Sequence, residues 1–164
     1  MNKALVYRRI RGGRIKISDD VLNKIEKYIQ YRDEDPEAGG VLLGRYVVGT
    51  KDVVVDFITP PTKYDTRRRC YFYKDRRVHQ RIITQKWKRS NGSCNLIGEW
   101  HTHPEDFPNP SLYDMSEWRR LLKETVFEDD YLFFLIAGIK EIRIWEGDKH
   151  SGEIKQLQKV GEND

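Results

Sequence analysis

Runs of β-branched and aromatic residues recur along the chain and predict strands. Residues 41–48 and 52–58 form two such runs on either side of a Gly-Thr-Lys turn, which favours a hairpin. Further runs of the same kind cover residues 4–10, 95–101, 131–138 and 141–147. The sequence therefore predicts a sheet built from segments throughout the chain.

Three other segments place apolar residues at helical spacing. The first covers residues 19–31 and follows Ser18, a favourable N-cap residue. The second covers residues 75–89, and the third begins at Ser111. The residues expected to face inward are Val21, Leu22, Ile25, Tyr28 and Ile29 in the first, Val78, Ile82 and Trp87 in the second, and Leu112, Met115, Leu121 and Leu122 in the third.

The order of these elements predicts an α+β fold, close to α/β, with a mixed central sheet flanked by about three helices. The chain has 164 residues, which suits a single domain over residues 1–164. A domain of this size buries enough surface to fold without disulfides. From about residue 152 the sequence is mostly polar, and we expect a tail there.

The sequence carries no sign of a membrane or an oxidising compartment. The first 16 residues are charged throughout and lack the apolar core of a signal peptide. The longest apolar run, residues 131–139, has about half the length that a bilayer span requires. Cys70 and Cys94 form no CxxC pair, which argues against a thiolate zinc site. We expect a soluble, cytoplasmic protein, and the sequence predicts no oligomeric state.

Positive charge is concentrated in one part of the chain. The net charge is only +4, but residues 63–89 hold eleven Lys and Arg against two acidic residues, with several aromatics among them. Such a mixture occurs in nucleic-acid-binding surfaces. It is more often a solvated helix face or a dock for an acidic protein, and we favour these interpretations over nucleic acid.

Two of the four histidines, His101 and His103, stand one residue apart at the end of a predicted strand. Residues i and i+2 of a strand point to the same face, so the two imidazoles can lie side by side. Zinc accepts such nitrogens, together with a third ligand and an open fourth position in catalytic sites. Asp114 is a candidate third ligand, since three prolines stiffen the loop between it and the histidines.

Ser111 and Asp114 also have a purely structural interpretation. Ser-x-x-Asp before an amphipathic segment resembles a capping box, in which Asp114 would bond to the backbone near Ser111 and never meet a metal. Glu37, in the acidic turn DEDPE, is likewise unremarkable on its own. We interpret Trp100 and Trp118 as packing residues, and His79 and His150 as ordinary helix or surface residues.

The whole stretch nevertheless resembles a known motif. His101-Thr-His103-Pro, six residues, Ser111, two residues and Asp114 is similar to the JAMM motif of the JAB/MPN metallopeptidases at every fixed position. That family also uses an upstream glutamate before a glycine-rich strand, which Glu37-Ala-Gly-Gly-Val-Leu-Leu-Gly resembles. The resemblance spans residues 37–114.

The resemblance implies a role for each matching residue. His101, His103 and Asp114 would hold one Zn²⁺ and leave a water in the fourth position. Glu37 would act as general base, and Ser111 would donate a hydrogen bond to the oxyanion of the tetrahedral intermediate. The implied activity is cleavage of a peptide or isopeptide bond.

The segment GEWHTHPEDFPNPS most resembles the JAB proteins of bacterial CBASS antiphage operons. This resemblance implies a protein substrate with a flexible C-terminal tail, either a cGAS-like nucleotidyltransferase or a ubiquitin-like protein, joined to a target amine. One alternative is a JAB peptidase that processes sulfur-carrier or ubiquitin-like proteins. Another is a non-catalytic MPN scaffold or a nucleic-acid-binding module that uses residues 63–89.

Overall fold

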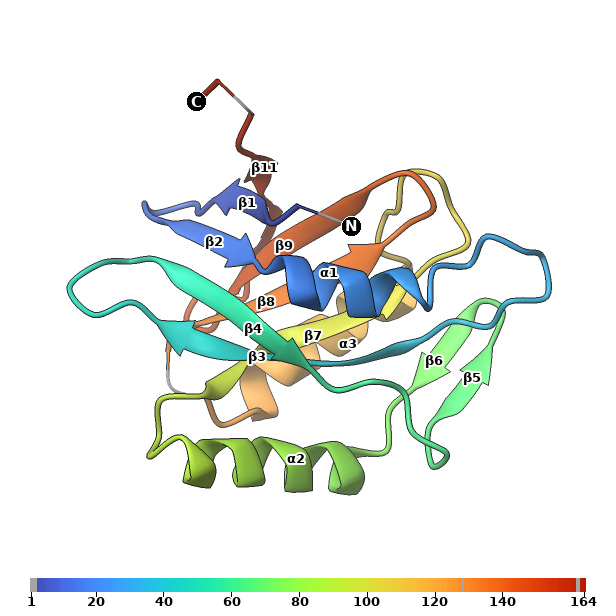
Figure 1. Cartoon of the computed structure of the whole chain (residues 1–164), viewed down its shortest axis with the longest axis horizontal. Coiled ribbons are helices and arrows are strands. Elements are labelled where there is room, and N and C mark those ends of the chain that lie inside the picture. Colours follow the sequence, from blue (N-terminus) through green and yellow to red (C-terminus); the bar gives the residue numbers. More distant parts are fainter. Residues whose placement is uncertain (1–2, 128, 162) are drawn as a thin grey trace.

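The structure is a computed structural model that describes residues 3–127, 129–161 and 163–164. Its centre is a nine-stranded sheet in the order β10-β9-β8-β7-β3-β4-β2-β1-β11 (Figure 1). The strands are β1 (Leu5–Arg8), β2 (Arg14–Ile17), β3 (Gly39–Tyr46), β4 (Val53–Ile58), β7 (Asn95–Thr102), β8 (Tyr131–Ala137), β9 (Ile142–Asp148), β10 (Ile154–Gln156) and β11 (Gln158–Lys159). β2 pairs with β4 and β7 with β8 in parallel, while the other pairs are antiparallel, so the predicted mixed sheet is confirmed.

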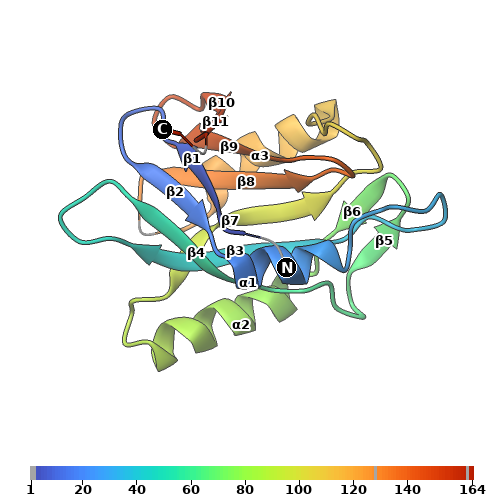
Figure 2. The same cartoon turned by 45° about the horizontal axis from the view of Figure 1, so that its top comes forward.

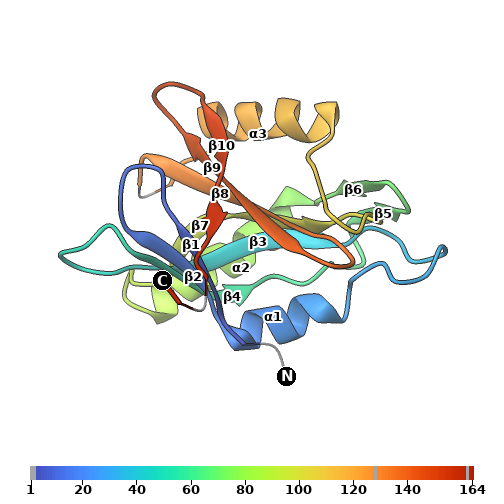
Figure 3. The same cartoon turned by 90° about the horizontal axis from the view of Figure 1, so that it is seen from above.

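Helices cover both faces of this sheet. They are α1 (Asp19–Glu26), α2 (Arg76–Arg89) and α3 (Leu112–Glu124). α1 and α3 lie on opposite sides (Figure 3). Alternate residues of β8 follow this division, because Phe133 and Leu135 belong to the core under α1 and Phe134 packs with Trp118 of α3. α2 packs through Ile82 and its neighbours on β3 and β7. The predicted single α+β domain with three helices is therefore confirmed.

Several elements lie where the sequence predicts them. β3 and β4 form the expected antiparallel hairpin. Ser18 caps α1 by accepting the Val21 N–H, and Asp75 caps α2. α1 ends at Glu26 and not at residue 31 as expected. The five residues beyond it turn through short-range bonds, and Gln30 is buried there by polar contacts with other segments. Among the described residues, no helix is both long and apolar enough to cross a bilayer.

Two residues expected to face inward are exposed. Leu112 stands in the first turn of α3 and is 92% exposed, and Trp87 of α2 is 49% exposed. The inward face of α2 includes His79 and Ile82, and Trp87 lies beside this face. The Trp87 ring packs near Gly92 instead. Both inward assignments were wrong.

Two segments for which the sequence predicts no strand are also paired in the structure. β5 (Thr66–Arg68) and β6 (Tyr71–Tyr73) form a separate two-stranded hairpin. Near the C-terminus, β10 pairs with β9 and β11 pairs with β1, so the two ends of the strand order lie side by side (Figure 2). Leu157 between them is buried. Residues 152–161, although mostly polar, are thus part of the fold and do not form the tail that composition suggested.

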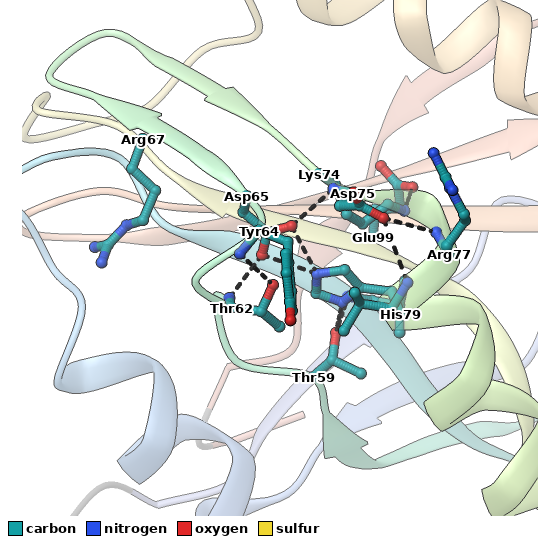
Figure 4. A network of polar contacts seen from close by, with 12 residues as sticks. Thr59, Thr62, Tyr64, Asp65, Arg67, Lys74, Asp75, Arg77, His79 and Glu99 are labelled. Carbon is teal, nitrogen blue, oxygen red and sulfur yellow. Dashed lines mark hydrogen bonds and ion pairs between the residues drawn. The ribbon is translucent and has the colours of Figure 1, made fainter.

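His79 is not the ordinary helix residue that the sequence suggested, because it is buried in a polar network (Figure 4). Its Nε2 lies 2.9 Å from Asp65 Oδ2, and its Nδ1 lies 2.6 Å from Thr59 Oγ1. Asp65 also accepts the N–H groups of Thr62 and Asp75. These partners assign the proton to Nε2 and make Thr59 the donor to Nδ1. The network joins the start of α2 to the base of the β5–β6 hairpin.

Candidate metal centre

The site begins at the end of β7, which carries His101, and His103 follows directly after the strand. Their Nε2 atoms lie 2.9 Å apart. The β3–β7 ladder fixes this end of the strand, since Gly39 pairs with His101. Gly39 is needed there because a Cβ atom would lie 2.6 Å from the ring of Phe72 on β6. The Trp118 ring lies edge-on to that of His101, with the ring centres 6.3 Å apart.

Asp114 in the first turn of α3 completes a cluster with the two histidines. Its Oδ1 lies 3.4 Å from His101 Nε2, and its Oδ2 lies 3.1 Å from His103 Nε2. Three ligands about 2.1 Å from a tetrahedral zinc ion would be separated by about 3.4 Å, close to this spacing. Two imidazole nitrogens and a carboxylate oxygen thus fit a zinc ion, with a fourth position left for water.

Ser111 and Asp114 form the capping box that the structural interpretation predicts. The Asp114 N–H donates to Ser111 Oγ at 3.0 Å, and the Ser111 N–H donates to Asp114 Oδ2 at 2.8 Å. The same carboxylate nevertheless faces both histidines. Capping and metal binding are therefore compatible, because the cap orients the carboxylate. The Ser111 hydroxyl accepts in the cap, and its hydrogen stays available for another acceptor.

The charge states of the cluster suit metal binding. Burial alone would raise the pKa of Asp114, but hydrogen bonds from His101 and His103 hold that pKa well below its usual range. Burial tends to lower the pKa of His103, and Asp114 more than offsets this and raises it. A metal ion would compete with the proton on His103, so metal binding should displace that proton.

Glu37 lies beside the cluster in the segment between α1 and β3. The Thr102 N–H donates to Ala38 O, which continues the β3–β7 register and brings Glu37 next to His103. The Glu37 side chain is buried, and its pKa is raised to about 8, first by desolvation and then by Asp114 and Glu105, while His103 opposes the shift. A buried carboxylate with a raised pKa is suited to accept and return protons near neutral pH.

These residues line one cavity of about 300 Å³. The metal cluster, Glu37 and Ser111 lie in it together, with β6 and α3 among its walls. Tyr71 of β6 and Tyr113 of α3 lie across from each other with ring centres 5.9 Å apart, and Tyr73 continues the aromatic wall. Figure 2 shows the β5–β6 hairpin next to the loop that leads into β3.

All five residues singled out in the sequence thus meet at one place. Trp100 and Trp118 are buried, as expected of packing residues, and His150 is at the surface. Sequence reasoning missed the β5–β6 wall, for which the Tyr-Phe-Tyr run at 71–73 was the available signal. Glu105 approaches the site through a 3.5 Å contact with His103 Nδ1, opposite the nitrogen that faces Asp114.

Fold and site together define a JAB-type domain, and comparison with known families agrees. The profile of the family described as prokaryotic homologs of the JAB domain matches residues 27–147. The match includes all five residues of the site. This chain belongs to that family.

Three curated relatives carry the name CD-NTase/cGAS isopeptidase. The protein from Vibrio cholerae is 34% identical over 95% of both chains, and the one from Escherichia coli is 33% identical over 88% of both. The protein from Pseudomonas aeruginosa is 43% identical over 65% of this chain and 66% of its own length. Together with the family, these names support a hydrolase of the isopeptidase type associated with CBASS.

A solved structure shares the fold at lower identity. A Desulfitobacterium hafniense protein determined in solution superposes with a TM-score of 0.58 and 18% identity, covering 87% of this chain and 88% of that one. At this identity the likeness concerns the fold alone.

Proposed function

We propose that this protein is a zinc-dependent isopeptidase of a bacterial CBASS antiphage system. It would remove a cGAS-like nucleotidyltransferase from its targets by cleaving after the C-terminal tail of that protein. The observation that carries the proposal is the convergence of Glu37, Ser111 and the three-ligand cluster on one cavity.

His101, His103 and Asp114 would hold the zinc ion. When bound, Zn²⁺ polarises a carbonyl oxygen and lowers the pKa of a bound water to about 7. Glu37 would take a proton from the attacking water and pass it to the leaving amine. Burial opposes ionisation of Glu37, but a nearby dication favours the carboxylate, so the base is ready when the ion is in place.

Ser111 would act on the reacting carbonyl. Its oxygen is fixed by the N–H of Asp114, which leaves the hydroxyl hydrogen as the donor that can face the cavity. Such a fixed donor stabilises the oxyanion of the tetrahedral intermediate. The capping box therefore holds the Ser111 oxygen in place and also orients the Asp114 carboxylate.

The cavity favours an extended chain as substrate. Its walls are a short strand, β6, and the first turns of α3, so a flexible tail can enter where a folded segment cannot. An extended tail can pair with an exposed strand edge and so place its last carbonyl near the metal. The names of the curated relatives point to a CD-NTase or cGAS-like protein as the owner of that tail.

The basic segment at 63–89 would contact the folded body of the substrate protein. α2 carries six Lys and Arg residues and no acidic residue, and most of its side chains are exposed or half-buried. Arg76 lines the cavity and also begins this basic face, so the two surfaces are continuous. An acidic substrate body would dock there and bind faster at low ionic strength.

The test offers the zinc-loaded protein three C-terminal fusions to a reporter: a cGAS-like nucleotidyltransferase, a sulfur-carrier protein and ubiquitin. We expect release from the nucleotidyltransferase fusion. Release from the sulfur-carrier fusion alone would leave a metallopeptidase of different substrate class. Release from none, with zinc bound, would indicate a scaffold, and a gel-shift titration against salt would then test the nucleic-acid module.

A further inference from the structure

Two buried polar side chains outside the five-residue site meet just behind it. Thr102 stands between the two histidines on β7, with its side chain on the opposite face, and Gln30 lies in the loop after α1. Both are almost completely buried, at 0% and 1% exposure. Neither has a place in the chemistry described above, so their burial calls for an explanation.

The Thr102 hydroxyl bridges two segments. It donates to Gln30 Oε1 at 2.9 Å and accepts the Ala38 N–H at 2.9 Å. The amide of Gln30 completes the network, since its Nε2 donates to Asp35 O at 3.0 Å and to Arg69 O at 2.8 Å. Two carbonyl acceptors fix which end of the amide is nitrogen, so each polar atom of this pair has a partner.

The segment that these bonds hold is the one that carries Glu37. Residues 29–38 form neither helix nor strand, apart from a turn at 32–34, so Glu37 lies outside the regular elements, two residues before β3 begins. The backbone of Glu37 is bound to the hairpin. Its N–H donates to Arg68 O at 2.8 Å, and its carbonyl oxygen accepts from Arg67 Nε at 2.9 Å. The hairpin in turn reaches the ligand strand through Gln30 and Thr102.

We infer that Gln30 and Thr102 are positioning residues that set the place of Glu37 relative to the histidine ligands. The inference rests on the proposed function, because it assumes that Glu37 is the general base. The Thr102 hydroxyl ties Ala38, the residue after Glu37, to the chain between His101 and His103. Gln30 ties the β5–β6 hairpin, which forms a wall of the cavity, to the same Thr102 hydroxyl. A base displaced by about 1 Å loses much of its effect, while ligands held by β7 and α3 stay in place.

The test uses Thr102→Val, which keeps the shape and removes the hydroxyl, and Gln30→Met, which removes the amide without touching β7. We expect kcat to fall by about 10- to 100-fold in each, with KM within about twofold of wild type and one zinc per chain retained. Thr102→Ser restores the hydroxyl and should return kcat to near the wild-type value.

A matched control separates positioning from general stability. Tyr7 is also almost fully buried, and its hydroxyl donates to Ile142 O at 2.6 Å, which joins β1 to β9; among the described residues this hydroxyl makes no hydrogen bond to the Glu37 segment. Tyr7→Phe removes a buried hydroxyl as Thr102→Val does, and it should lower the melting temperature while leaving kcat unchanged.

Three outcomes would overturn the inference. They are an unchanged kcat in both test variants, a loss of zinc that accounts for the lost turnover, or unfolding of both variants, which would show that the bonds hold the core and not the base. A wild-type protein without turnover would instead contradict the proposed function, so the two failures are distinguishable.

Discussion

Replacing Glu37 by Gln should make the protein inactive and, without metal, more stable. The variant keeps the shape of the side chain but cannot carry charge or accept a proton. Turnover should fall by at least about 10²-fold, since general-base catalysis typically contributes that much or more. Zinc should stay bound, because the proposed ligands are His101, His103 and Asp114.

The stability gain follows from the raised pKa of Glu37. Folding moves that pKa from 4.5 to about 8, so the folded protein binds the proton more tightly than the unfolded chain. The resulting stabilisation is complete below about pH 4.5 and is lost as the pH rises through about 8. One pKa unit corresponds to about 1.4 kcal/mol, and solvent at the cavity mouth screens part of the penalty. At pH 7 Glu37 is ionised in the unfolded chain and mostly protonated in the folded protein, and this difference should cost about 2–3 kcal/mol of unfolding free energy.

Urea unfolding of metal-free wild type and Glu37→Gln at pH 5, 7 and 8.5 measures this difference. We expect the smallest difference in unfolding free energy at pH 5 and an increasing advantage of the variant above it. Glu34→Gln is the control, because Glu34 is exposed in the same loop. Parallel pH profiles for wild type and Glu37→Gln would refute the reasoning, since they would mean that Glu37 is not buried beside an acidic cluster.

The other predictions concern the ligands, the cap and the basic helix. Asp114→Ala should lose zinc by elemental analysis, whereas Ser116→Ala on the same helix should keep one zinc per chain. Ser111→Ala should lower turnover roughly 10²–10³-fold, because Ser111 is the proposed oxyanion donor, and it should cost about 1 kcal/mol of stability, because Ser111 caps α3. A loss of stability with unchanged turnover would show that Ser111 acts only as a helix cap. Arg81→Glu on α2 should raise KM for the intact protein substrate at low salt but not for a short tail peptide, and an equal increase for both would contradict docking at α2. Chelation of the metal should lower the melting temperature, and re-addition of zinc should restore it; an unchanged melting temperature would argue against a folded-state zinc site.

Patterns of local origin could be predicted from the sequence. The β3–β4 hairpin and the caps at Ser18 and Ser111 depend on residues close together in the chain, and the structure confirms them. The motif around His101 also brings its ligands together, because strand geometry and one helical turn fix their spacing. The alternating Arg-Ile-Lys-Ile of β2 carried the same kind of signal and was overlooked.

Features that depend on contacts distant in the chain could not be predicted in this way. His79 is buried because Asp65 and Thr59, from two other segments, supply its partners, and a helical pattern shows none of this. The paired strands after residue 152 are short and polar, and they take their order from edges provided by β9 and β1. The contacts of Gln30 likewise exist only in the folded chain.

The central claim is that the cluster at His101, His103 and Asp114 forms a zinc centre that cleaves a conjugated nucleotidyltransferase from its target. The most direct measurement follows release from a cGAS-like nucleotidyltransferase conjugate by the purified protein as isolated, after chelation, and after re-addition of zinc. We expect release by the zinc-loaded protein, none after chelation, and recovery with close to one zinc per chain. Release that persists undiminished in the metal-free protein, or no release from a fully zinc-loaded one, would contradict the account.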